Sequence, residues 1–415
     1  MADLTGQSHS SVWHEGEQAL QKSTGLSDQM IADRARVIRN FMPDQHRTFF
    51  AQLPFLVVGS VDASGAPWAS MLAGEPGFVT SPDPTHLRVA ARAMTGDPLA
   101  ASLDIGARLG LLGIELPTRR RNRMNGRIVE RNDAGFTVAV DQSFGNCPKY
   151  IQARDYAGEV VPREIVVEPL PELDAEARRL IPGSDTFFVA SYVADDYGRP
   201  AGVDISHRGG PTGFIRIEPD GALTIPDFPG NRFFNTLGNL LVNPRAGLLF
   251  IDFAKGDLLQ ITGNTEVLRD DAQRDKALAA DYPGAERFWR FKPGHSRWLR
   301  HALPLRLDFV DFSPASRAVG TWREQPEQER PGLAVAAGEV TPSSPARAQS
   351  SHHAPDCRVP RPYATGPTGS GGGGIKGGCC GTGGGSPGTG GPGGVAGGSG
   401  SAGRGGKLAG PGESG

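Results

Sequence analysis

The sequence predicts a mainly β fold with flanking helices, in which one β domain occurs twice in tandem. Short apolar runs rich in Val, Ile and Phe follow Pro54 and are separated by Gly, Pro, Asp and Asn turns, a texture typical of a barrel or a sandwich. Several of these runs recur after about 135 residues, a spacing too long for a solenoid unit and typical of a duplicated domain. From residue 323 onward the hydrophobic periodicity is lost, and the sequence after residue 366 is rich in glycine.

The segment ahead of the first apolar run, residues 1–53, has a helical pattern. Its apolar side chains recur about every three or four positions, at Met30, Ile31, Ala35, Ile38 and Phe41. Ser27 is suited to cap the start of a helix, and Pro43 is suited to break one. We therefore expect a helical segment before the first β domain.

The internal repeat is clearest in two pairs of segments. Gly110–Leu116 matches Gly247–Phe253, and Val57–Val61 matches Phe188–Tyr192. The acidic, proline-containing run between the copies indicates a connection that is partly helical near residues 174–180. The predicted organisation is an N-terminal helical segment at 1–53, a first repeat at 54–158, a connection at 159–182, a second repeat at 183–322 and a disordered tail at 323–415.

Charge and cysteine content argue against several classes of function. A formal net charge of −2 creates no overall field that would attract nucleic acid or an anionic membrane. Cys147 is the only cysteine ahead of the tail, so we expect no disulfide in the folded part and a reducing compartment. The first residues lack the pattern of a signal peptide, and no segment has the length of a membrane span. We expect a cytoplasmic protein without a nucleic-acid or membrane partner.

The densest polar cluster lies in the second repeat, between residues 227 and 240. Its candidate binding residues are Gly230, Asn231, Arg232, Asn235 and Asn239. Glycine lets the backbone approach a ligand closely, and amide and guanidinium groups are donors that can hold a phosphate or the carbonyl edge of a flavin. The alternative is a capped helix between strands, in which Asn231 and Asn235 bond to the local backbone. The local pattern leaves both interpretations open.

Two further runs carry basic side chains. His207 and Arg208 stand at a turn and precede glycines whose N–H groups can form an anion-binding nest, although a charged hairpin loop is the alternative. The run Arg119–Arg123 in the first repeat could receive a phosphate, but we interpret it as a solvated hairpin tip. No aromatic residues interleave with these arginines, which argues against nucleic-acid binding.

The segment 146–152 also contains polar residues with functional chemistry. Lys149 and Gln152 are candidates to face a ligand. Cys147 has no nearby His or acidic partner in the sequence, so we interpret it as a small buried residue at a turn and not as a nucleophile. The histidines show no metal-ligand spacing, and no metal site is expected.

Three segments together resemble the pyridoxamine 5'-phosphate oxidase-related FMN-binding proteins. They are Phe55–Asp62, Asn146–Gln152 and Gly230–Asn239, and the resemblance extends over residues 13–322. It implies a split β-barrel that binds FMN at the interface of two barrels, both supplied here by one chain. By position, it implies that the FMN contacts are Gly230, Asn231, Arg232, Asn235 and Asn239, with His207 and Arg208 as neighbours. Arg232 is our choice for the phosphate or the pyrimidine edge of the flavin.

The resemblance further implies an FMN-dependent oxidoreductase in which the cofactor carries the hydride chemistry. Its substrate would be an unidentified small molecule, with electrons from a nicotinamide nucleotide or an electron-transfer protein, and no catalytic side chain is assigned. Because fold alone does not define function, a non-catalytic flavin or haem carrier is the alternative, and a deazaflavin is an alternative cofactor. A homodimer is compatible with this interpretation.

Two features depart from known relatives. Longer relatives continue into a ferredoxin-reductase-like module and a plant-type iron–sulfur domain, whereas the sequence after Trp322 has neither the expected strands nor a C-x4-C-x2-C ligand set. Our hypothesis is a reading-frame change or truncation near Trp322, and an uninterrupted frame in independent isolates would count against it. The substrate-phosphate motif of pyridoxamine 5'-phosphate oxidase is also not seen, so oxidation of vitamin B6 is not expected.

Overall fold

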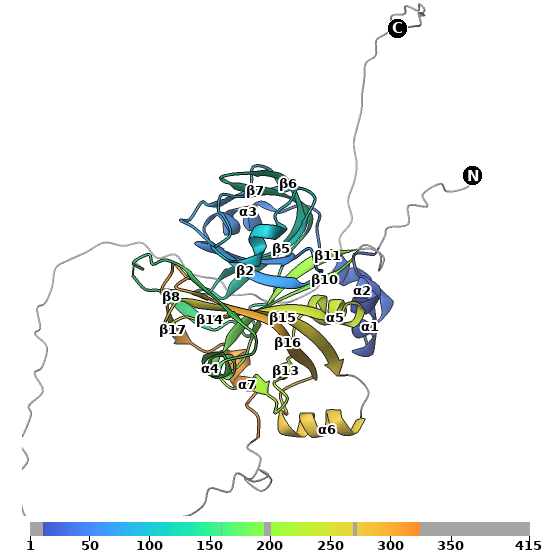
Figure 1. Ribbon diagram of the computed structural model, residues 1–415. Helices are drawn as coiled ribbons and strands as arrows, with labels where there is room; N and C mark the ends of the chain where they lie inside the picture. Colours follow the sequence, from blue (N-terminus) through green and yellow to red (C-terminus); the bar gives the residue numbers. More distant parts are fainter. Residues whose placement is uncertain (1–10, 159, 195–200, 269–271, 324–415) are drawn as a thin grey trace, which may run out of the picture. The chain divides into compact units, whose positions relative to one another are not determined.

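The computed structural model describes residues 11–158, 160–194, 201–268 and 272–323, which form two β-barrels and the helices around them (Figure 1). This confirms the prediction of a mainly β fold with flanking helices and two tandem barrels. The predictions of a disordered tail and of a frame change concern residues that, from 324 onward, lie outside the described residues. Among the described helices, none is long and apolar enough to cross a membrane.

The helical N-terminal segment consists of short helices, of which the first two have side-chain caps. They are α1 (Glu15–Ser23), α2 (Asp28–Ala35) and α3 (Asp44–Ala51). Ser27 caps α2, as the sequence predicts, because its side chain accepts a hydrogen bond from the Met30 N–H. His14 caps α1 in a capping box, in which the Glu17 carboxylate accepts a hydrogen bond from the His14 N–H. These caps define where the two helices begin.

The first barrel is a seven-stranded antiparallel sheet with the order β2-β1-β5-β6-β7-β4-β3. Its strands are β1 (Phe55–Val61), β2 (Pro67–Ala73), β3 (Val79–Thr80), β4 (His86–Val89), β5 (Arg108–Glu115), β6 (Arg120–Asn132) and β7 (Gly135–Gly145), with the 3-10 helix η1 (Pro98–Ser102) before β5. Apolar residues of these strands and of α3 close its interior, among them Phe50, Leu56, Leu111 and Val138.

The second barrel repeats the same strand order, β11-β10-β14-β15-β16-β13-β12. Its elements are β10 (Thr186–Val193), β11 (Gly202–Gly209), β12 (Arg216–Ile217), β13 (Leu223–Asp227), α5 (Asn235–Val242), β14 (Arg245–Asp252), β15 (Asp257–Leu268) and β16 (Arg287–Arg300). The equal order in both sheets confirms the duplication inferred from the sequence repeat. Helix α5 takes the place that η1 has in the first barrel.

The remaining elements join the barrels and cover the second one. They are β8 (Ala153–Tyr156), β9 (Val166–Leu170), α4 (Ala175–Gly183), α6 (Ala272–Asp281), β17 (Leu307–Asp311) and α7 (Pro314–Ala318). Strand β9 pairs with β16, and β8 pairs with β17. The connection predicted at 159–182 therefore adds a strand to the second sheet before it forms α4, whose N-cap is Asp174.

The barrels share a buried apolar cluster, to which β1 and β5 of the first barrel and β10 and β14 of the second contribute. Two equivalent glycines let the strands approach closely. A Cβ on Gly110 would lie 2.8 Å from backbone atoms of β11, and a Cβ on Gly247 would lie 2.3 Å from the Pro67 carbonyl oxygen in β2. These glycines occupy matching positions in the repeat, so the close crossing of strands is itself duplicated.

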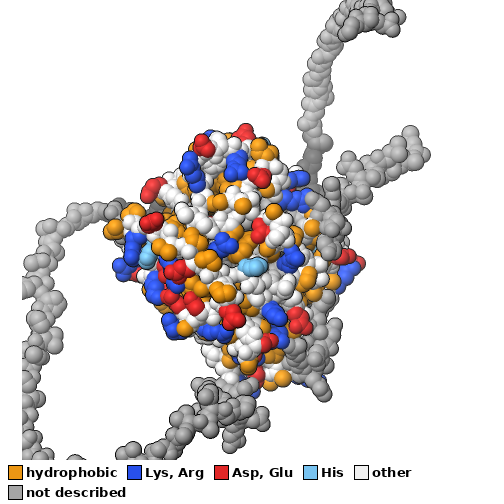
Figure 2. Space-filling view, in the orientation of Figure 1, with side chains coloured by type: hydrophobic (Ala, Val, Ile, Leu, Met, Phe, Trp, Pro, Cys, Tyr) orange, Lys and Arg blue, Asp and Glu red, His pale blue; other side chains and the backbone are white. Residues whose placement is uncertain are grey.

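Charged side chains are mixed on the outside of the molecule. On the face in Figure 2, Lys and Arg side chains are interspersed with Asp and Glu side chains. This distribution agrees with the formal net charge of −2. The functional argument therefore depends on individual pockets and not on a field over the whole molecule.

Candidate functional site

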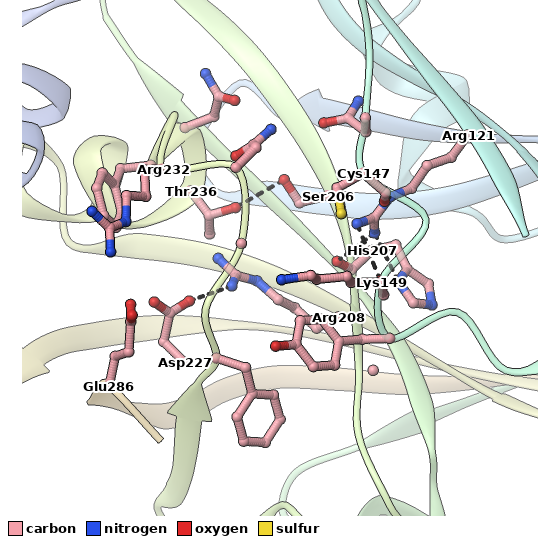
Figure 3. Close-up of a pocket in the computed structure, with 18 of the residues that line it drawn as sticks. Arg121, Cys147, Lys149, Ser206, His207, Arg208, Asp227, Arg232, Thr236 and Glu286 are labelled. Carbon is pink, nitrogen blue, oxygen red and sulfur yellow. Dashed lines mark hydrogen bonds and ion pairs between the residues drawn. The ribbon is translucent and has the colours of Figure 1, made fainter. Parts of the chain in front are cut away.

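A cleft lies between the barrels, where the start of β6 and the β7–β8 connection face β11 and the loop between β13 and α5 (Figure 3). With its open side included, the cleft has a volume of about 940 Å³. The centre of a water molecule fits in about 120 Å³ of that volume. It is thus an open cleft and not a closed cavity. Its polar lining includes Arg121, Arg123, Asn146, Lys149, Ser206, His207, Arg208, Asp227, Asn231, Arg232, Asn235, Thr236, Glu286 and Arg287.

Part of the positive charge in this cleft is neutralised by protein carboxylates. Asp227 accepts hydrogen bonds from Arg208 Nη1 at 2.5 Å and from Arg287 Nη1 at 2.7 Å. Arg123 forms a buried ion pair with Asp204, with an Nη1–Oδ1 distance of 3.2 Å. These pairs hold the walls of the cleft together.

Three cations of the cleft have no carboxylate partner among the described residues: Arg121, Lys149 and Arg232. Arg121 donates hydrogen bonds to the Cys147 carbonyl oxygen at 2.9 Å and to His207 Nδ1 at 3.0 Å. Burial lowers the pKa of Arg121 to about 10, which leaves the guanidinium charged at neutral pH. A partly buried cation without a counter-ion favours an anionic ligand.

His207 is buried and neutral. Since the Arg121 guanidinium can only donate, His207 Nδ1 accepts its hydrogen bond and the ring proton lies on Nε2. Burial, together with the nearby Arg121, Arg154 and Arg208, lowers the pKa of His207 well below its usual range. At neutral pH the side chain is therefore a hydrogen-bond donor through Nε2.

Residues that line the cleft also carry buried donor atoms that lack an acceptor. Within the described part of the chain they are Arg123 Nε, Asn146 Nδ2, His207 Nε2 and Arg208 Nε. Buried polar atoms are normally hydrogen-bonded, and such a set at one pocket calls for an explanation. All four are donors, so the group that would satisfy them is rich in acceptor oxygens or nitrogens.

The loop between β13 and α5 forms the opposite wall in Figure 3 and has an unusual backbone. Arg232 and Phe234 have φ angles of 58° and 62°, in the left-handed region that side chains other than glycine rarely adopt. Asn231 Oδ1 accepts a hydrogen bond from the Phe233 N–H at 3.1 Å, which is a local backbone contact. Neither Asn231 nor Asn235 caps α5, because its N-cap is Phe234 without a side-chain hydrogen bond and Asn235 donates to Glu17. Strained loops of this kind are concentrated at binding sites.

The structure brings together most of the predicted binding residues. Gly230, Asn231, Arg232, Asn235, His207 and Arg208 line the cleft. Asn239 does not, because its amide lies one turn farther along α5, where it donates to Ser191 Oγ and Asp204 Oδ2. The assignment of these residues as FMN contacts stays a prediction.

The interpretation of Arg119–Arg123 as a solvated hairpin tip is wrong for Arg121 and Arg123. Both lie on β6 and reach the cleft, whereas Arg120 between them is exposed. Side chains alternate between the two faces of a strand, so alternate arginines share one face. In the sequence, that alternation was the signal that Arg121 and Arg123 face the same side. Like Arg121, Arg123 is missing from the residues that the sequence led us to select for the site.

The segment 146–152 contributes as partly predicted. Asn146, Cys147 and Lys149 line the cleft, and Cys147 is half-buried. Gln152 does not face the cleft, because it is fully buried and donates to the Gly210 carbonyl oxygen and to Ser316 Oγ. Among the described residues, no cluster of His, Cys, Asp and Glu has the arrangement of a metal site.

The duplication would produce an equivalent cleft on the other side of the barrel interface. Strand registers identify the equivalent positions. In the first barrel Gly59 of β1 pairs with Ala69 and Gly110. In the second barrel Ala190 of β10 pairs with Ile205 and Gly247. Counting from these pairs, His207 corresponds to Met71, Arg208 to Leu72, Arg121 to Leu258 and Arg123 to Gln260.

The equivalent position is apolar and filled. Met71, Leu72 and Leu258 are buried. Gln260 Nε2 donates to Ser70 Oγ and Asp97 Oδ2, both at 3.2 Å, and Ser70 Oγ donates to Asp97 Oδ1 at 2.6 Å. Three arginines of the cleft are thus replaced here by Leu258, Gln260 and Leu72. Only one of the two pseudo-equivalent positions in the described chain has the polar lining of a binding site.

The comparison with protein families agrees with this architecture. The family model described as pyridoxamine 5'-phosphate oxidase matches twice, over residues 42–166 and 173–298. No curated protein matches the chain. A protein from Clostridium acetobutylicum, related to general stress protein 26 and to the pyridoxinephosphate oxidase family, is 19% identical and covers 32% of this chain and 92% of its own, with a TM-score of 0.23.

Two further solved structures show similar values. A FAD-binding protein from Mesorhizobium loti is 15% identical and covers 32% of this chain and 98% of its own, with a TM-score of 0.21. The haem storage protein HutZ from Vibrio cholerae is 13% identical and covers 30% of this chain and 89% of its own, with a TM-score of 0.21. The two family-model matches cover more than half of the sequence and coincide with the two barrels. The chain therefore belongs to the pyridoxamine 5'-phosphate oxidase family, with the family's domain present twice.

Proposed function

We propose that the cleft between the barrels binds FMN and that the protein is an FMN-dependent oxidoreductase acting on a small molecule. The observation that carries the proposal is a set of buried donors for which the described residues offer no acceptor, on residues that line the cleft beside cations for which they offer no carboxylate. FMN combines a phosphate with a ring edge of carbonyl oxygens and nitrogens, so one ligand offers partners to both groups. Membership in the pyridoxamine 5'-phosphate oxidase family supports a flavin over other phosphorylated ligands.

The residues of the cleft divide into two groups with different tasks. Arg121, Lys149 and Arg232 would bind the phosphate, since they are the cleft cations that no carboxylate of the described residues neutralises. Asn146 and His207 would donate to the ring edge through buried N–H groups that are otherwise unused. The division follows charge, because a dianion favours the free cations over neutral donors.

An aromatic wall completes the cleft. The rings of Tyr150 and Phe228 lie 5.3 Å apart, and Phe234 stands on the strained loop. Such a wall can cover one face of a planar ring system and exclude water from it. When bound, FMN supplies hydride or electron transfer. Since His207 is neutral and keeps its proton at neutral pH, its task would be to donate a hydrogen bond and not to abstract a proton.

The test is the visible spectrum of the purified full chain after incubation with FMN, with the released cofactor identified by mass. We expect a flavin spectrum that NADH, NADPH or a reduced electron-transfer protein bleaches and that air restores. A folded protein that takes up no flavin would overturn the cofactor assignment. A retained flavin that no donor reduces would favour a non-catalytic carrier, a haem spectrum would favour a haem carrier, and the fluorescence of the extract would reveal a deazaflavin.

The closed equivalent position predicts the stoichiometry of binding. We expect one FMN per chain. At the equivalent position Met71, Leu72 and Leu258 replace His207, Arg208 and Arg121 of the open cleft. The flavin-to-protein ratio, measured by absorbance against amino-acid analysis and by native mass spectrometry, checks this expectation. A ratio of two would show that the apolar position opens to a second cofactor.

A further inference from the structure

The N-terminal helices bond to the loop between Gly230 and Asn235, which we call the cofactor loop. Three side chains of the helices reach it from outside the cleft. Arg34 Nη1 donates to the Asn231 carbonyl oxygen at 2.6 Å, Gln21 Nε2 donates to the Phe233 carbonyl oxygen at 3.3 Å, and Glu17 Oε1 accepts from Asn235 Nδ2 at 2.7 Å. Their partners are spaced at every second residue, so the contacts span the loop.

An apolar contact supports the same loop. The Phe233 ring is buried between Trp13 of the N-terminal segment and Phe144 of the first barrel, with ring centroids 5.2 Å and 5.7 Å away. Trp13 Nε1 in turn donates to the Ile31 carbonyl oxygen at 3.2 Å, which joins the residues ahead of α1 to α2. Phe233 thus anchors the cofactor loop in a cluster formed largely by the N-terminal segment.

Helix α1 also packs closely against α5, which begins where the cofactor loop ends. A Cβ on Gly16 would lie 2.2 Å from the Gly238 carbonyl oxygen, and a Cβ on Gly238 would lie 2.6 Å from Glu17 Cγ. Only glycine at both positions permits this distance between the helices. The close approach brings the buried Glu17 carboxylate to Asn235 at the wall of the cleft.

The cofactor loop needs support from outside because its own backbone is strained. Arg232 and Phe234 each occupy the left-handed region, at a cost of about 1 kcal/mol or more per residue. Arg232 is also one of the cations without a carboxylate partner, so its placement depends on this conformation. External contacts must therefore hold the loop in the shape that presents Arg232.

We propose that residues 12–38 act as a clamp that holds the cofactor loop in its binding conformation, and that docking of the clamp and binding of the flavin favour one another. Arg34 and Gln21 are positioning residues, since neither lines the cleft and both act through backbone carbonyls of the loop. The coupling to flavin rests on the proposed function. The support of the loop by the clamp does not.

Thermodynamic coupling acts equally in both directions. If the clamp strengthens flavin binding by a given factor, flavin strengthens docking of the clamp by the same factor. Removing one partly buried, charge-assisted hydrogen bond weakens an equilibrium by about tenfold. We therefore expect about tenfold weaker FMN binding in Arg34→Ala, a smaller loss in Gln21→Ala, and partial recovery in Arg34→Lys, which keeps a donor.

The experiment compares these variants with two controls at α2, Gln29 within the helix and Arg36 at its C-cap. Arg36→Ala and Gln29→Ala remove side chains that contact Asp33 and not the cofactor loop. The dissociation constant for FMN is measured by quenching of flavin fluorescence, and amide hydrogen exchange is followed over residues 15–35 and 230–236. We expect FMN to slow exchange in residues 15–35 of the parent protein, although none of these residues lines the cleft.

The outcomes separate the clamp from the cofactor assignment. If the parent protein binds no FMN, the proposed function fails, yet the clamp still predicts faster exchange at residues 230–236 in Arg34→Ala than in Arg36→Ala. Equal exchange of the loop in these two variants would overturn the clamp. Equal affinity for FMN in Arg34→Ala and Arg36→Ala, with a flavin that leaves exchange at residues 15–35 unchanged, would overturn the coupling.

Discussion

Replacing Arg121 with leucine is expected to weaken FMN binding by about 100-fold or more. Arg121 is a half-buried cation without a carboxylate partner in the described part of the chain, and its guanidinium also orients His207 through Nδ1. Loss of one member of a desolvated charge pair costs roughly 2–5 kcal/mol of binding free energy. The same substitution leaves His207 Nδ1 without its donor, so the phosphate site and the ring-edge donor are affected together.

Leucine is the informative substitution because the protein already carries it at the equivalent position. Leu258 occupies the place of Arg121 in the second barrel and is buried there. The fold should therefore tolerate Arg121→Leu with little change in thermal stability. Arg131→Leu is the control, since Arg131 lies on the same strand and pairs with Asp104 away from the cleft. Parent-like affinity of Arg121→Leu for FMN in a fluorescence titration would show that the phosphate lies elsewhere.

Gly247→Ala is expected to lower the free energy of unfolding by about 3 kcal/mol. The added Cβ would lie 2.3 Å from the Pro67 carbonyl oxygen and 2.7 Å from Trp68 Cα, so two backbones would have to separate. A backbone clash is not relieved by a change of rotamer, and the strands concerned, β14 and β2, belong to different barrels. The strain therefore falls on the interface that also forms the cleft.

The measurement is equilibrium unfolding in guanidinium chloride, followed by tryptophan fluorescence. Gly145→Ala is the control, because a Cβ at Gly145 meets its nearest atom, Asn122 Oδ1, at an ordinary 3.5 Å. Gly145 has extended backbone in β7, so alanine fits its conformation as well. A Gly247→Ala protein as stable as Gly145→Ala would show that the barrels separate there without cost.

The fold was largely predictable because its signals are local. Alternating apolar residues and turn residues define strands within a few positions, and a duplicated domain leaves the same pattern twice in one chain. Gly110 and Gly247 were visible as matching positions of that repeat. Ser27 was likewise recognisable as a cap, since a cap acts on an N–H three residues away.

The site was only partly predictable because its contacts are not local. The loop at residues 230–235 was evident from its composition, but its partner Arg121 belongs to the other barrel. Arg121 and His207 are 86 residues apart in the chain, and no pattern in either segment predicts that they are in contact. The contact between Gly16 and Gly238 is equally invisible, since each glycine alone is an ordinary helix residue.

The sequence by itself determined the family, the tandem repeat and the strand content of both barrels, because these depend on residues near one another along the chain. Tertiary structure decided which of two equivalent positions remains an open cleft, which cations there lack a partner and which helices support the strained loop. Those properties arise where the surfaces of two barrels and an N-terminal segment meet. Burial and unpaired charge at such a meeting point depend on all its sides at once, and no single segment encodes them.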